Sequence, residues 1–77
     1  MRAVISQEGE WWVGQCIEQD IAAQSKTFEG AIKELKDMIE AYEELYASEN
    51  AAGPPATPQD VIDKLRQRAG AQEVDLG

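Results

Sequence analysis

The sequence predicts a single small α+β domain: a three-stranded antiparallel sheet, then a long helix, then a short second helix and a possible edge strand. The first 24 residues contain short runs of β-branched and aromatic residues separated by polar turns, which is typical of strands. Residues 28–46 place apolar side chains at the i, i+3, i+4 spacing of an amphipathic helix. The chain has 77 residues, the length of one domain.

The first two strands are expected to form a hairpin. Residues 2–8 are moderately apolar, and residues 11–17 are rich in aromatic and β-branched side chains, which favour strands. Gly9 lies between the two runs and can take the positive φ that a tight turn requires. After a polar break at residues 18–20, residues 21–24 could form a third short strand.

Apolar side chains occur on both faces of the second predicted strand. Alternate residues of a strand share a face, so Trp11 and Val13 point away from Trp12 and Cys16. An antiparallel sheet with one solvated face alternates more cleanly. We therefore expect the long helix to cover one face, and the C-terminal segment or a second subunit to cover the other. One tryptophan should be in the core, and the other in internal packing or at an interface.

The long helix is expected to begin after Thr27, a good N-cap residue, with Glu29 at the positive end of the helix dipole. The late acidic residues Glu40, Glu43 and Glu44 oppose the dipole, which prefers cations there. They indicate either an exposed helix end or an acidic docking face. The predicted apolar stripe is Phe28, Ala31, Ile32, Leu35, Met38, Ile39, Tyr42, Leu45 and Tyr46.

The C-terminal part is expected to pack on the same domain as the core formed by residues 1–49. A proline-containing linker at residues 50–56 leads to Thr57, a predicted N-cap, and to a second helix over residues 58–69. The tail at residues 72–76 alternates polar and apolar side chains, so it is either a last edge strand or a frayed end. The predicted apolar stripe of the second helix is Val61, Ile62 and Leu65.

The composition argues against several kinds of active site. The chain has no histidine, the commonest general base and metal ligand, and only one cysteine, Cys16. One cysteine allows neither an intramolecular disulfide nor a cysteine-based zinc site. Metal-dependent nucleases need several converging carboxylates, and the first predicted strand carries none before Glu8. We therefore expect no catalytic residue, no bound metal and no cofactor.

The net charge of −8 is concentrated in residues 28–49, whose balance is −5. Such a surface repels phosphate backbones and anionic membranes and would attract a basic protein, although acidity can also serve solubility alone. Lys64, Arg66 and Arg68 suit the negative end of the second helix, which explains them without nucleic acid. No apolar stretch suggests a signal peptide or a membrane span, so a cytoplasmic location is expected.

Two stretches carry a resemblance to a known family. Residues 12–24, WVGQCIEQDIAAQ, would form a strand, an acidic turn and a further strand, and residues 27–31, TFEGA, would start the long helix. Their order and spacing resemble the HicB-like antitoxin family over residues 2–46. The resemblance implies a partial RNase H-like fold and a protein-binding role, in which a small, basic, RNA-cleaving HicA-like toxin is covered and neutralised.

Full antitoxins of this kind often carry a C-terminal DNA-binding extension. Residues 50–77 offer one helix, whereas a ribbon-helix-helix or helix-turn-helix needs two. The sequence therefore predicts a stand-alone core domain, and DNA binding by this chain alone is not expected.

Three residues are the predicted contacts to a protein partner: Trp11, because exposed tryptophan is enriched at interfaces, and the acidic pair Glu18 and Asp20. The pair could instead be a solvated turn, and two carboxylates do not make a closed metal site. A domain this small often gains stability by oligomerising, so a homodimer or higher oligomer is expected. The alternative function is a structural or small-ligand-binding homo-oligomer with no toxin partner.

Overall fold

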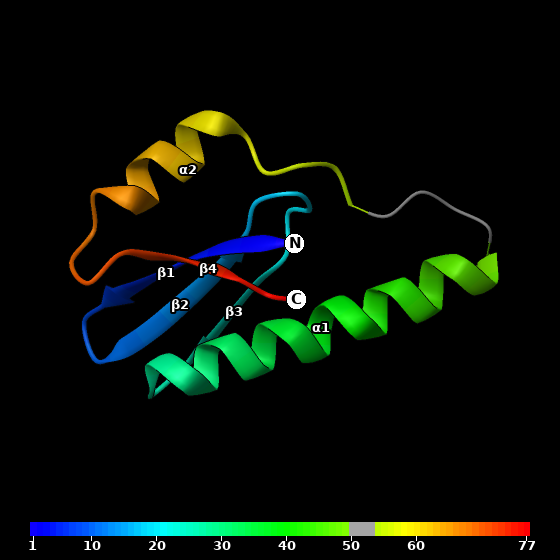
Figure 1. Ribbon diagram of the computed structural model, residues 1–77, viewed down its shortest axis with the longest axis horizontal. Helices are drawn as coiled ribbons and strands as arrows, with labels where there is room; N and C mark the ends of the chain where they lie inside the picture. Colours follow the sequence, from blue (N-terminus) through cyan, green and yellow to red (C-terminus); the bar gives the residue numbers. More distant parts are fainter. Residues whose placement is uncertain (50–53) are drawn as a thin grey trace.

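The computed structural model describes residues 1–49 and 54–77. These residues form a four-stranded antiparallel sheet, in the order β3-β2-β1-β4, and two helices that lie on opposite sides of it (Figure 1). Residues 50–53 of the predicted linker lie outside the described part. The elements are β1 (Arg2–Glu8), β2 (Trp11–Cys16), β3 (Ala22–Ser25), α1 (Phe28–Glu49), α2 (Gln59–Arg66) and β4 (Gln72–Asp75).

The sheet has four strands, where the sequence predicts three and leaves the fourth open. The C-terminal tail pairs with β1 from Arg2 opposite Asp75 to Ile5 opposite Gln72. The backbone N–H of Leu76 then donates to the carbonyl of Met1 at 2.7 Å. The α+β class is confirmed, and β1 becomes a central strand although it comes first in the chain. The RNase H-like relation remains a prediction.

The β1–β2 hairpin agrees with its prediction. Glu8 pairs with Trp11, and the two residues between them form the turn, in which Gly9 has a φ of 61°. A positive φ costs glycine little because it has no Cβ. β3 begins one residue later than predicted and pairs with β2 from Gln15 opposite Ala22 to Trp12 opposite Ser25.

The main core lies between the sheet and α1. Thr27 caps this helix as predicted, since its Oγ1 accepts a hydrogen bond from the Gly30 N–H at 2.9 Å. The rings of Trp12 and Phe28 meet edge to face with centroids 5.4 Å apart. Cys16 is fully buried, as expected for a small apolar side chain. The buried members of this core are Ala3, Ile5, Cys16, Ile21, Ala31, Leu35 and Ile39.

On the other face, α2 packs over β1. Ile62 and Leu65 lie against Val4, so the C-terminal segment supplies a cover for this face within one chain. Val61, the third member of the predicted apolar stripe, is 37% exposed and does not join this cluster. The helix also ends at Arg66 rather than residue 69, and Gly70, with a φ of 67°, turns the chain towards β4.

The prediction that Thr57 caps α2 is also wrong. Pro58 occupies the N-cap position, and the helix start has no side-chain cap. The Thr57 hydroxyl instead donates to the Cys16 carbonyl at 2.6 Å and accepts from the Gln15 amide at 3.0 Å. Thr57 is held there because its own N–H donates to the carbonyl of Ile17. The segment before α2 is thereby fastened to the corner between β2 and β3.

Candidate protein-binding site

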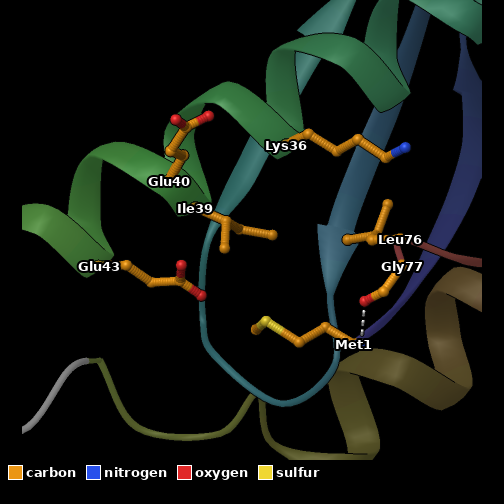
Figure 2. Close-up of a pocket in the computed structure, with 7 residues that line it drawn as sticks. All are labelled: Met1, Lys36, Ile39, Glu40, Glu43, Leu76 and Gly77. Carbon is orange, nitrogen blue, oxygen red and sulfur yellow. Dashed lines mark hydrogen bonds between the residues drawn. The ribbon is translucent and has the colours of Figure 1, made fainter.

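A groove of about 460 Å³ lies between α1 and the paired ends of the chain (Figure 2). Ile39 projects from α1 towards Leu76, and the Met1 side chain runs along the same opening. These three residues give the groove an apolar floor. Its remaining lining residues are Lys36, Glu40, Glu43 and Gly77.

Helix geometry explains one wall of the groove. Lys36, Ile39, Glu40 and Glu43 follow the spacing i, i+3, i+4, i+7, so they form one stripe along α1. Ile39 is the buried member of this stripe, and the other three are exposed. The stripe therefore places an apolar side chain beside two carboxylates and one ammonium group.

Pairing between β4 and β1 forms the opposite wall. The hydrogen bond from the Leu76 N–H to the Met1 carbonyl brings residues from the two ends of the chain side by side. The Met1 amino group also lies 3.5 Å from the Gly77 oxygen. The sequence does not reveal this wall, because it depends on a strand pairing over nearly the whole chain. Two sequence features bear on the groove: the late acids of α1, and the polar and apolar alternation of residues 72–76.

The surface of α1 beside the groove is negative. The exposed acids of the helix whose side chains are described are Glu29, Glu34, Asp37, Glu40, Glu43 and Glu44, against two lysines. Lys33 is paired with Asp37 at 3.2 Å, and this hydrogen bond raises the pKa of the lysine. The last turn of α1 carries no basic residue, so no cation at that end of the helix offsets the acidic side chains.

Glu18 and Asp20 are brought together in the exposed turn between β2 and β3, and both have partners within the chain. The Glu18 carboxylate accepts a hydrogen bond from the Arg2 N–H at 2.8 Å and lies 3.6 Å from the Arg2 guanidinium. The hydrogen bond from the Arg2 backbone is the main cause that lowers the pKa of Glu18. Asp20 accepts from the Gln15 amide at 3.1 Å.

Trp11 lies at the opposite end of β2 from this acidic turn. Trp11 and Cys16 are the two ends of the 6-residue strand β2, which places them about 17 Å apart, and Glu18 follows beyond Cys16. The Trp11 side chain is 40% exposed, and the Lys26 ammonium lies 4.3 Å from the centre of its ring. The structure therefore does not gather the three predicted contact residues into one site.

No family model, curated protein or solved structure matches the chain. Among the residues that the structure describes, no group of three or more histidine, cysteine, aspartate or glutamate side chains could hold a metal ion. Neither described helix is long and apolar enough to cross a membrane.

Proposed function

We propose that this domain is a protein-binding module, similar in role to HicB antitoxins, that captures a small basic protein. The proposal rests on one observation above all. The groove beside α1 combines an apolar floor with the Glu40 and Glu43 carboxylates, which share one exposed stripe of an acidic helix. Apolar contact and opposite charge are the two features that bind a basic side chain.

An arginine or lysine of the partner is the natural occupant. Its alkyl stem would lie on Ile39 and Leu76, and its cation would reach the carboxylates of Glu40 and Glu43. The remaining acids of α1 would speed the encounter by attracting the partner over longer distances. The domain would act by covering the active surface of an RNA-cleaving toxin and would perform no catalytic step itself.

Trp11, Glu18 and Asp20 remain predicted contacts of the same partner. A partner that binds Glu18 has to compete with Arg2, which already donates to that carboxylate from its backbone. The Glu40 and Glu43 side chains carry no such bond to the backbone among the interactions described. We therefore assign the leading role to the groove and a supporting role to the acidic turn.

Capture from the native cytosol with three matched variants tests the proposal. We expect the tagged chain to retain one small basic protein in a fixed ratio. The double change Glu40→Lys and Glu43→Lys should weaken its binding at least tenfold. The change Glu34→Lys with Glu44→Lys alters the charge equally on the same helix outside the groove, and should weaken binding less.

The third variant, Glu18→Lys with Asp20→Lys, separates the turn from the groove. A loss confined to this variant would move the docking site to the turn. Retention of no basic protein by the wild-type chain would contradict the proposed function altogether.

One observation favours a second candidate function, the binding of a small ligand by a homo-oligomer. The groove volume of about 460 Å³ falls within the usual range of small-molecule sites, roughly 300 to 1,000 Å³. Native mass spectrometry of the chain purified from its own cytosol decides between the two. A bound small molecule with no protein partner would support the second candidate, and a basic protein alone would support the first.

A further inference from the structure

One edge of the sheet lacks the usual protection against pairing with another strand. β3 is an edge strand, and its four residues, Ala22–Ser25, carry no charge. The opposite edge, β4, carries Glu73 and Asp75. Charged side chains on an edge strand discourage pairing with another chain. The β3 edge is therefore the one that is suited to accept another strand.

The pairing with β2 shows which backbone groups of β3 point outwards. Cys16 donates its N–H to the Ile21 carbonyl at 2.9 Å, so these two residues face each other as a hydrogen-bonded pair. Along an antiparallel ladder, hydrogen-bonded pairs alternate with non-hydrogen-bonded pairs. The next two hydrogen-bonded pairs therefore contain Ala23 and Ser25. Ala22 and Gln24 consequently direct their N–H and carbonyl groups away from β2, towards the free edge.

A second copy of the chain fits this edge in one symmetric register. With Ala23 on the two-fold axis, Ala22 of each copy faces Gln24 of the other, and both residues offer outward backbone groups. Asp20 and Lys26 flank the two ends of β3, so this register brings the Asp20 end of each copy next to the Lys26 end of the other. Opposite charges in facing positions stabilise an antiparallel pair, and like charges destabilise it. The chain is thus complementary to itself here, in spite of its net charge of −8.

Exposed apolar side chains border the same edge on both faces of the sheet. On the face that α2 shares, a shallow hollow of about 190 Å³ is lined by Val13, Ala22, Ala23 and Gln24, next to the 40% exposed Trp11. On the other face, Met38 is 36% exposed. Met38 is about 200° around the helix from Lys36 and from Glu40, which line the groove beside β4, so it lies on the β3 side of α1.

We propose that two copies of this chain pair antiparallel through β3, with Ala23 on the two-fold axis, and form one continuous sheet. Lys26, whose ammonium lies over Trp11 and 3.5 Å from Glu10, is then at the same end of the paired segment as Asp20 of the other copy. This inference does not depend on the groove, which lies beside the opposite edge of the sheet. A failure of the proposed partner binding would therefore leave it unaffected.

A charge-exchange experiment on the purified chain tests the register. Asp20→Lys alone places lysine next to lysine, and Lys26→Asp alone places aspartate next to aspartate. Each variant should dimerise at least tenfold more weakly than the wild-type chain in analytical ultracentrifugation. An equimolar mixture of the two variants should recover the dimer, because one copy of each then places a lysine next to an aspartate at both ends of the paired segment.

A second pair of variants tests the edge itself. Gln24→Pro removes an outward N–H from β3 and should abolish the dimer, while Asp75→Pro changes the β4 edge and should leave it intact. Circular dichroism shows whether each variant stays folded. A concentration of roughly 100 µM favours even a weak dimer. A wild-type chain that is monomeric at this concentration would overturn the proposal. So would a variant mixture that stays monomeric, or a dimer that dissolves only on Asp75→Pro.

Discussion

The side-chain amide of Gln15 donates a hydrogen bond of 3.0 Å to the hydroxyl of Thr57, a residue 42 positions further along the chain. Both side chains are buried, and the Thr57 hydroxyl donates a hydrogen bond to the Cys16 carbonyl. The Gln15 amide also lies within hydrogen-bonding distance of Asp20. Two buried polar groups thus join the segment before α2 to the end of β2 and to the acidic turn.

Replacement of Thr57 by valine should destabilise the fold by about 1–3 kcal/mol. Valine keeps the shape of threonine but removes the two hydrogen bonds of the hydroxyl to the Gln15 amide and the Cys16 carbonyl, and each such bond contributes about 0.5–1.5 kcal/mol. Urea unfolding followed by tryptophan fluorescence measures the change. Thr57→Ser retains the hydroxyl and serves as the control. A loss in the serine variant with no loss in the valine variant would show that the methyl group matters rather than the hydrogen bonds.

Gly14 of β2 faces α1 at a position with little room for a side chain. A Cβ at this position would lie 3.0 Å from Ile5 Cδ1 and 3.3 Å from Leu35 Cδ2. Gly14→Ala should therefore destabilise the domain by about 1–3 kcal/mol through overpacking. Ile5→Val removes the nearer methyl group, so in a double-mutant cycle it should recover part of that loss. Strictly additive free energies would contradict a direct contact between the two positions.

The parts of the fold that the sequence predicts correctly are those with local signals. Gly9 marks the hairpin turn and Thr27 marks the start of α1, and both act within a few residues of their own position. The expectation that two covers are needed came from apolar side chains on both faces of β2, and α2 supplies the second cover.

The parts that it predicts poorly depend on distant contacts. Threonine is a common N-cap residue, but the Thr57 hydroxyl forms its hydrogen bonds at the end of β2 instead. The groove needs Met1 and Leu76 side by side, which only the pairing of β4 with β1 provides. Trp11 and Glu18 are each predicted contacts for a separate reason, and β2, which begins at Trp11 and ends before Glu18, holds them apart.

The bond between the Arg2 backbone and Glu18 should make part of the stability depend on pH. The folded-state pKa of Glu18 lies below its ordinary value of 4.5, so the stabilisation is fully present above that pH and is lost as the pH falls through the folded pKa. Glu18→Gln should reduce stability at pH 7 by at most about 1 kcal/mol, because solvent screens a side chain that is 42% exposed.

Unfolding by urea at several pH values checks this prediction. The difference in unfolding free energy between wild type and Glu18→Gln should shrink below pH 4.5 and vanish in stronger acid. Glu10→Gln is a suitable control, since Glu10 lies in the exposed hairpin turn with an ion pair to Lys26 of 3.5 Å. A difference that is constant from pH 7 to strong acid would exclude the charge of Glu18 as its source.

The salt dependence of binding should distinguish the apolar floor of the groove from its carboxylates. If a basic partner binds there, raising the salt concentration should weaken binding, because ions screen the attraction between exposed charges. Glu43→Gln removes one of these charges, so it should lower both the affinity and the steepness of the salt dependence. Leu76→Ala shortens the apolar floor, so it should weaken binding roughly threefold to tenfold with the salt dependence unchanged.

Calorimetric titrations of the captured partner at several salt concentrations measure both quantities, and Glu44→Gln, outside the groove, supplies the matched control. Equal salt dependence in the Glu43→Gln and Glu44→Gln variants would mean that the partner senses only the general charge of α1 and does not occupy the groove.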